Sequence, residues 1–184
     1  MEAARTCRAC PLPHEPRPVF RLSPTAGLLI VGQAPGTRVH ATGLPWNDRS
    51  GDRLRDWLGL DRETFYDSAR IAILPIGLCF PGHDAKGGDL PPRPECAPLW
   101  HPRFRPLLPN IRLTLLVGRH AQAYYLKGRM KPTLSETVLA WPGYLPEFFP
   151  LPHPSWRNTA WLKANPWFEG EVVLELRRLV AAAI

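Results

Sequence analysis

The sequence predicts an α/β protein, a three-layer α/β/α sandwich around a central four-stranded, mostly parallel sheet. Short apolar runs that end at glycine or proline recur along the chain, which is typical of buried parallel strands. Segments with helical periodicity alternate with these runs, and strands alternating with helices form such sandwiches. The length of 184 residues suits one substantial core, so we expect a single domain over residues 1–184.

Each predicted strand is an apolar run that meets a glycine or a proline. The four runs are GLLIVG over 27–32, IAILPIG over 71–77, IRLTLLVG over 111–118 and FFPLP over 148–152. Residues that do chemistry in parallel sheets of this kind lie in loops beyond the carboxyl ends of the strands. We therefore look for a site in the segments that follow these runs.

Helices are predicted where apolar residues recur at helical spacing. From Asp48, the sequence DRSGDRLRDWLGL places Leu54, Trp57 and Leu58 on one face, and Asp48 or Ser50 can cap the start. A second helix is expected in HAQAYYL after the third strand. The last 16 residues, EGEVVLELRRLVAAAI, predict an amphipathic C-terminal helix.

The chain has four cysteines, in two pairs: Cys7 with Cys10 in CRAC, and Cys79 with Cys96. Four thiolates are the ligands that a tetrahedral zinc ion or an iron–sulfur cluster requires, and the spacing does not choose between them. Buried free cysteines and disulfides are the alternatives, but the N-terminus has no apolar run of a signal peptide, so we expect a reducing cytoplasm. A metal would tie the N-terminal arm, residues 1–20, to the loop 79–96.

The composition is basic, with 23 Lys and Arg residues against 16 Asp and Glu, a formal charge of +7. Arginine together with 10% aromatic residues suits phosphate contact combined with base stacking, although a solvated basic surface explains the charge equally well. No segment has the run of about 20 apolar residues that a membrane span needs. The composition therefore favours a nucleic-acid partner and no membrane.

Two loops after predicted strands carry unusual residues: GQAPG with its continuation GLPWNDRSG, and HPSWRN. GQAPG lacks the spacing of the dinucleotide-binding and P-loop glycine motifs, so a nucleotide cofactor is a poor interpretation. It does offer backbone amides and the side chain of Gln33. Gly32 and Gly36 are expected to allow a ligand to approach the backbone closely.

These segments, in this order, resemble the uracil-DNA glycosylase superfamily, within the iron–sulfur branch formed by its fourth and fifth families. The resemblance runs from CRAC through GQAPG, GLPWNDRSG, the loop 79–96 and VGRHAQAYYLKG to HPSWRN. It implies a DNA glycosylase of the bacterial or archaeal type, a monomer that acts on DNA containing a damaged base. It also implies a structural [4Fe–4S] cluster on Cys7, Cys10, Cys79 and Cys96, with zinc as the alternative.

The resemblance assigns roles to residues of both loops. Asp48 matches an aspartate that activates water, His153 matches the histidine that contacts the base oxygen beside the scissile bond, and Gln33 stands where the family often has an acid. Trp46 falls on the position that stacks on the extruded base. The remaining residues implied to bind the base are Gly32, Ala34, Pro35, Gly36 and Ser155, and those implied to bind DNA are Trp156, Arg157 and Asn158.

These residue types fit hydrolysis of an N-glycosidic bond. Positive charge grows on the sugar and negative charge on the departing base, so an anion such as Asp48 and a donor such as His153 stabilise the transition state. The target nucleotide must leave the duplex, and the Trp46 ring offsets the lost stacking. Asp48 can instead act only as a helix cap, Trp46 as a core residue and His153 as a turn residue.

The identity of the base stays open, because Pro75 stands where the fourth family has an asparagine that reads the pyrimidine edge. Proline has no side-chain donor and no N–H. We expect excision of a deaminated base, most simply uracil, with hypoxanthine or xanthine as alternatives. The competing hypotheses are a DNA-binding protein of this fold with little or no turnover, and a zinc-stapled module that binds RNA or nucleotides.

Overall fold

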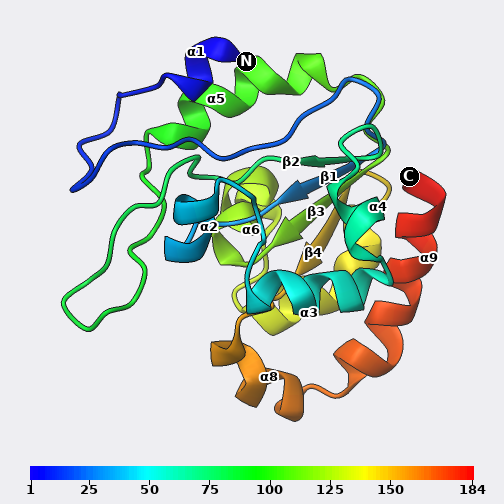
Figure 1. Ribbon diagram of the computed structural model, residues 1–184. Coiled ribbons are helices and arrows are strands. Elements are labelled where there is room, and N and C mark those ends of the chain that lie inside the picture. Colours follow the sequence, from blue (N-terminus) through cyan, green and yellow to red (C-terminus); the bar gives the residue numbers. More distant parts are fainter.

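The computed structural model describes all residues from Met1 to Ile184 and has one four-stranded sheet at its centre. The strands are β1 (Leu28–Val31), β2 (Ile71–Ile73), β3 (Leu113–Val117) and β4 (Phe148–Leu151). Their order is β2-β1-β3-β4 and every neighbouring pair is parallel (Figure 1). The predicted fold class is confirmed.

Alternate residues of each strand enter two separate cores, because successive side chains of a strand point to opposite faces. Leu28 and Ile30 pack in one cluster, and Leu29 and Val31 pack in the other. Both clusters are continuous and apolar, so the sheet is covered on both sides, as a buried parallel sheet requires.

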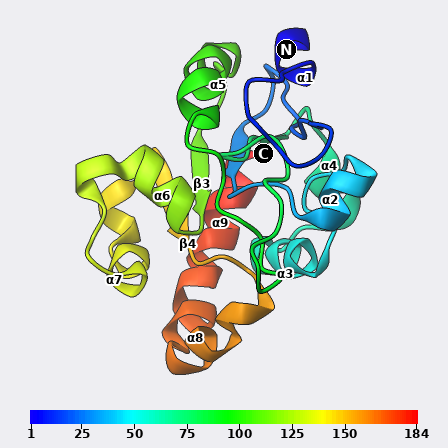
Figure 2. The same cartoon turned by 90° about the vertical axis from the view of Figure 1, so that its left-hand side faces the viewer.

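Helices of the two layers supply the rest of these cores. The first cluster receives α3 (Arg49–Leu58), α4 (Arg62–Tyr66), α7 (Leu134–Leu139) and α9 (Val173–Ala183). The second receives α1 (Glu2–Arg5), α5 (Cys96–Phe104) and α6 (Arg119–Leu126). Figure 2 shows α5 and α6 on the side of the sheet opposite α3 and α4. Two short helices, α2 (Thr37–Thr42) and α8 (Thr159–Ala164), stand by the loops that follow β1 and β4.

Two predicted elements differ from the structure in their extent. The strand expected over 71–77 ends at Ile73. The chain beyond it still runs beside β1 and the following loop, since Leu74 N–H bonds Ile30 O and Ile76 N–H bonds Gly32 O. The C-terminal helix expected from Glu169 opens as a π-helical turn over Phe168–Val172 before α9 begins. No helix is both long and apolar enough to cross a membrane.

Candidate active site

A cavity of about 600 Å³ opens beyond the carboxyl ends of β1 and β4. The loop after β1 forms one wall and the HPSWRN loop after β4 forms another. The structure brings together around this cavity all the residues that the sequence assigned to chemistry, base binding and DNA binding, namely Gly32, Gln33, Ala34, Pro35, Gly36, Trp46, Asp48, His153, Ser155, Trp156, Arg157 and Asn158.

Trp46 is held in a left-handed backbone conformation, with φ at 56°, which is rare for a bulky residue and costs on the order of 1–3 kcal/mol. Its indole lies against Gly32, where an added Cβ would stand 2.7 Å from the ring. Its carbonyl lies over Gly51 at 1.8 Å from such a Cβ. Only glycine at both positions leaves room for this tryptophan, which is 9% exposed and therefore belongs to the core as well as to the cavity wall.

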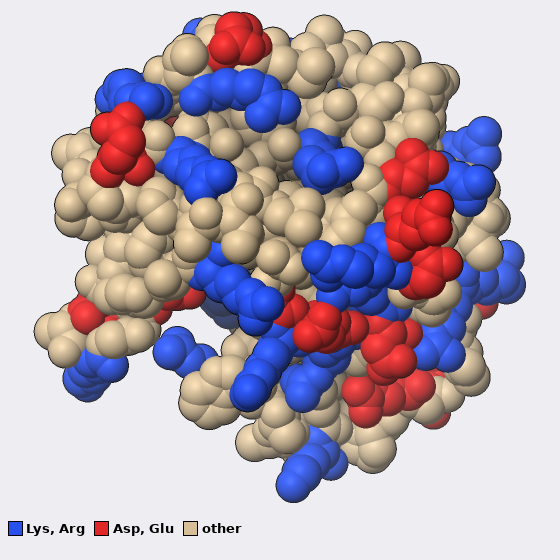
Figure 3. Space-filling view, in the orientation of Figure 1, with Lys and Arg blue, Asp and Glu red and all other residues tan.

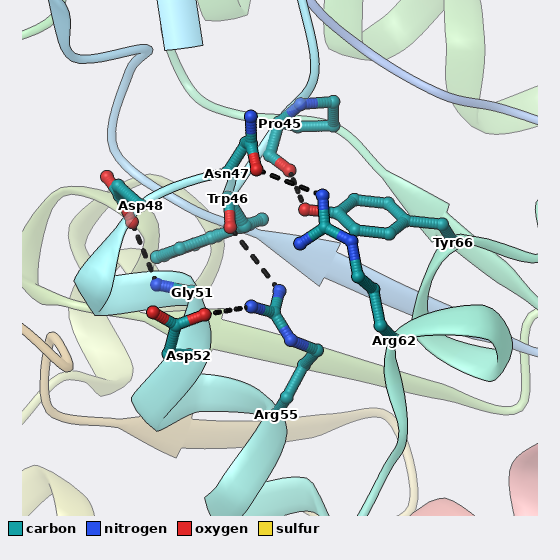
Figure 4. Close-up of polar contacts among 9 residues, drawn as sticks. All are labelled: Pro45, Trp46, Asn47, Asp48, Gly51, Asp52, Arg55, Arg62 and Tyr66. Carbon is teal, nitrogen blue, oxygen red and sulfur yellow. Dashed lines mark hydrogen bonds and ion pairs between the residues drawn. The ribbon is translucent and has the colours of Figure 1, made fainter. Parts of the chain in front are cut away.

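Three side chains hold the strained segment from behind (Figure 4). Arg55 donates to Trp46 O at 3.4 Å and pairs with Asp52, and Tyr66 donates to Pro45 O at 2.9 Å. Arg62 donates to Asn47 Oδ1 at 3.0 Å. The Arg55 guanidinium is buried and lies 5.3 Å from the centre of the Phe65 ring. These bonds fix three consecutive residues, so the surrounding structure offsets the backbone strain.

Asp48 both caps a helix and faces the cavity. Its Oδ1 accepts from Gly51 N–H at 2.8 Å at the start of α3, the capping role that its position allowed (Figure 4). The same carboxylate lines the cavity beside His153. A carboxylate has room for several hydrogen bonds, so the cap leaves its second oxygen available to a ligand.

His153 presents one ring nitrogen to the cavity as a donor. Ser155 N–H donates to His153 Nδ1 at 3.2 Å, which leaves the proton of the neutral ring on Nε2. The ring lies over Gly118, where an added Cβ would stand 3.4 Å from His153 Cδ2, and its centre is 5.6 Å from that of the Trp46 ring at a tilt of 35°. Burial, and then the charge of His120, lower the pKa of His153 against the opposing effect of Asp48. The imidazole is therefore neutral at physiological pH.

The HPSWRN loop is braced internally and from α3. Asn158 donates to His153 O at 2.8 Å, and Arg53 donates to Ser155 O at 3.2 Å. Trp156 projects outward with 73% of its surface exposed, and the Arg157 guanidinium lies 5.8 Å from its ring centre. The hydrogen-bonded loop thus presents an exposed aromatic side chain and a cation at the cavity mouth.

Gln33 and Pro75 line the same cavity but differ in what they offer a ligand. The Gln33 side chain makes no hydrogen bond within the chain, so both its donor and acceptor groups are available. The Pro75 carbonyl instead accepts from His101 Nε2 at 3.1 Å, and Tyr125 donates to His101 Nδ1 at 2.8 Å. Burial lowers the pKa of His101 to about 4, so this bridge is neutral.

Sequence reasoning missed several residues of the cavity wall. Asp89 comes from the loop between Cys79 and Cys96, where its Oδ1 lies 3.2 Å from His83 Nδ1. No motif or periodicity marks that residue, because only the folded loop carries it there. The other wall residues that were given no role at the site from the sequence are Val19, Arg38, Val39, Pro45, Arg49, Ser50 and Ile73.

Arginine dominates the charge around the cavity. Arg38, Arg49 and Arg157 line it against the carboxylates of Asp48 and Asp89. Lys and Arg side chains also gather on the lower half of the face shown in Figure 3, around α3, interleaved with acidic groups. The cavity mouth therefore combines cations with aromatic surface, which is what a polyanion with stacked bases requires.

The four cysteines lie around a second, narrow cavity between the N-terminal arm and the loop 79–96, which we call the thiol cavity. Burial and then the nearby thiol of Cys96 raise the pKa of Cys79 to about 12, and burial raises that of Cys96 to about 11. Leu78 N–H donates to Cys96 Sγ at 3.3 Å. No three His, Cys, Asp or Glu side chains of the chain gather closely enough to hold a single metal ion.

The model of the uracil DNA glycosylase superfamily matches residues 20–177, which include both loops of the cavity and all four strands.

Proposed function

Because this chain belongs to the uracil-DNA glycosylase superfamily, whose members are DNA glycosylases, we propose that it excises a deaminated base from DNA, most simply uracil, and leaves an abasic site. The observation that carries the proposal is the convergence of Asp48, His153 and Trp46 on one cavity at the carboxyl ends of the strands. An extruded nucleobase placed there would meet a carboxylate, a neutral imidazole donor and an aromatic wall.

His153 stabilises the leaving group in this proposal. As the N-glycosidic bond breaks, negative charge collects on the base oxygen next to it. His153 Nε2–H donates to that oxygen. The ring does not have to reorient for this, since the hydrogen bond from Ser155 N–H and the contact with Gly118 already fix it. A neutral donor suits this role, because its affinity for the oxygen rises as the charge develops.

Asp48 acts on the sugar and on the attacking water. Its carboxylate stabilises the positive charge on the sugar and orients a water toward C1′. As the C1′–N bond breaks and the water oxygen bonds to C1′, Asp48 accepts the proton that the water loses, and the departing base anion then takes up a proton from solvent. Gln33 cannot accept a proton, so its part is to hydrogen-bond the base or the water. The products are a free base and a DNA strand with an abasic sugar.

The cavity mouth supplies the contacts that take the nucleotide out of the helix. Trp156 is exposed enough to enter the space that an extruded base leaves, and Arg157 beside it contacts phosphate. The base then rests against Trp46. The absence of a donor at Pro75 places recognition of the base edge on Gln33 and on main-chain amides of the loop after β1.

We further propose that Cys7, Cys10, Cys79 and Cys96, which all line the thiol cavity, would hold a [4Fe–4S] cluster through their thiolates. Such a cluster would supply a fixed, thiolate-bound cross-link between the N-terminal arm and the loop 79–96. Since that loop also carries Asp89 into the active-site wall, the cross-link would steady one side of the base pocket. Brown colour and visible absorbance after anaerobic purification, with iron and sulfide analysis, distinguish the cluster from zinc.

The test of the proposed function is a panel of oligonucleotides that carry uracil, hypoxanthine, xanthine or a mismatched thymine, in single and double strands. Alkaline cleavage reveals abasic sites under single-turnover conditions. We expect excision of at least one deaminated base, and a loss of about 10²–10⁴-fold in rate for His153→Ala. Binding without cleavage of any substrate, or full activity of His153→Ala, would contradict the proposal.

A further inference from the structure

Two buried N–H groups face the thiol cavity with no acceptor. Trp100 is 6% exposed, and its Nε1–H has no hydrogen-bond partner. The Nε–H of Arg93 is also buried without a partner, and both residues line the cavity together with the four cysteines. A buried donor left unsatisfied costs about 1–3 kcal/mol, so two of them at one cavity require an explanation.

The local structure holds both residues beside the cysteines. Trp100 follows Cys96 by four residues on α5, so the two side chains share one face of the helix. Its ring is fixed by Phe104, stacked at 5.7 Å, and by the Arg103 guanidinium 5.3 Å from its centre. Arg93 Nη2 lies 3.4 Å from Glu95 Oε1, whereas Arg93 Nε is buried without a partner in a residue that lines the cavity.

We propose that Arg93 Nε–H and Trp100 Nε1–H donate hydrogen bonds to sulfur atoms of the iron–sulfur cluster held by the four cysteines, and thereby set its stability and reduction potential. The inference rests on the cluster assigned above. Sulfur is a weak hydrogen-bond acceptor when neutral and a better one as a thiolate or sulfide. Binding of the cluster would therefore supply the acceptors that these two N–H groups lack. Donors to sulfur favour the more negative, reduced cluster and raise its potential.

One N–H group already donates to a cysteine sulfur of this cavity, since Leu78 N–H bonds Cys96 Sγ. With Arg93 and Trp100, the cavity would provide three N–H groups from three segments of the chain. Arg93 adds a positive charge, which offsets the negative charge of four thiolates. The contribution of the positive charge can be separated from that of the hydrogen bond by Arg93→Lys, because lysine keeps the charge but has no planar Nε–H.

The test uses full-length protein purified anaerobically, with the variants Trp100→Phe and Arg93→Lys. Matched controls are Trp141→Phe, whose ring stacks on Phe149 away from the thiol cavity, and Arg70→Lys, whose exposed ion pair is with Asp67. Voltammetry measures the one-electron reduction potential, and the decay of visible absorbance in the presence of a chelator measures cluster loss. Circular dichroism checks that each variant is folded.

We expect a more negative potential and roughly 10-fold faster cluster loss for Trp100→Phe and Arg93→Lys, with both controls unchanged. Wild-type potentials and decay rates in both folded variants would overturn the inference. Colourless protein containing zinc would overturn it as well. Neither result bears on base excision, which the oligonucleotide panel measures separately.

Discussion

At the scale of single residues, the site uses side chains that also hold the fold together. Asp48 caps α3 and also lines the cavity, and Trp46 belongs to a core cluster and also forms part of the cavity wall. The sequence left cap and catalyst as alternatives for Asp48, and the geometry accommodates both. A substitution at such a residue has to be designed so that the two roles are separated.

Asp48→Asn makes that separation, because asparagine caps helices about as well as aspartate but carries no charge. We expect melting temperature to change little and single-turnover excision to slow by about 10²–10³-fold, the usual effect of losing one electrostatic stabiliser. The matched control is Asp61→Asn at the cap of α4, where Oδ1 accepts from Thr64 N–H at 2.7 Å. Equal single-turnover excision rates for Asp48→Asn and Asp61→Asn would show that the Asp48 charge does not contribute to catalysis.

At the scale of elements, the sequence predicted the strands well and the connections poorly. Apolar runs locate all four strands, and Pro150 is tolerated in β4 because that strand lies at the edge of the sheet. Helix α5 was not predicted, since Pro98 and Pro102 argue against a helix. Pro98 falls in the first turn, where its missing N–H has no helical acceptor, and burial of Trp100 and Phe104 stabilises the rest.

The packing of α3 beneath Trp46 depends on Gly51. Alanine is the better helix former, but its Cβ would stand 1.8 Å from Trp46 O, so α3 would have to move. We expect Gly51→Ala to lower the free energy of unfolding by about 1–3 kcal/mol, as overpacking does. Gly170→Ala is the control, because nothing lies within 4 Å of its added Cβ. Urea unfolding of both variants provides the measurement, and similar stabilities would refute the close packing.

His101 links α5 and α6 to the segment after β2, and its neutral state makes this link dependent on pH. Its pKa is about 4 when folded and near 6.5 when unfolded, so only the unfolded chain takes up the proton between those values. The stabilisation is complete above pH 6.5 and is lost as pH falls toward 4. At roughly 1.4 kcal/mol per tenfold change in proton affinity, the loss is about 3 kcal/mol.

Thermal unfolding of wild-type protein and of His101→Gln between pH 7 and 4 measures this contribution. Glutamine can still donate to the Pro75 carbonyl but does not titrate. We expect the variant to be less stable at pH 7 and its stability to change less with pH across the window. Parallel curves for the two proteins would show that His101 does not control the acid response.

At the scale of the whole molecule, charge and topology act together. The net charge of +7 was visible in the sequence, but its location was not, because Arg38, Arg49 and Arg157 come from separate segments. Likewise, Asp89 reaches the cavity only through the fold of the loop 79–96. What the sequence predicted of the site is the part carried by contiguous motifs, and what it missed depends on contacts between distant segments.

Binding to DNA is expected to weaken steeply with salt, because each phosphate contact releases counterions. Fluorescence anisotropy with a DNA duplex at several salt concentrations gives the slope of log affinity against log salt. Arg157→Ala should lower the magnitude of that slope by about 1. Arg178→Ala on α9, whose side chain pairs with Glu175, should leave it unchanged. An unchanged slope for Arg157→Ala would exclude its contact with phosphate.

The left-handed backbone at Trp46 has a consequence for how substrate is selected. Because the Trp46 ring packs against Gly32 and its backbone is held by Gly51 and Arg55, we expect the ring not to move aside for one base and close on another. The conformational entropy of this wall is lost during folding, so binding of DNA does not have to order it again. Under the proposed function, we therefore expect discrimination at entry, where an extruded nucleotide either fits the preformed cavity or returns to the DNA helix.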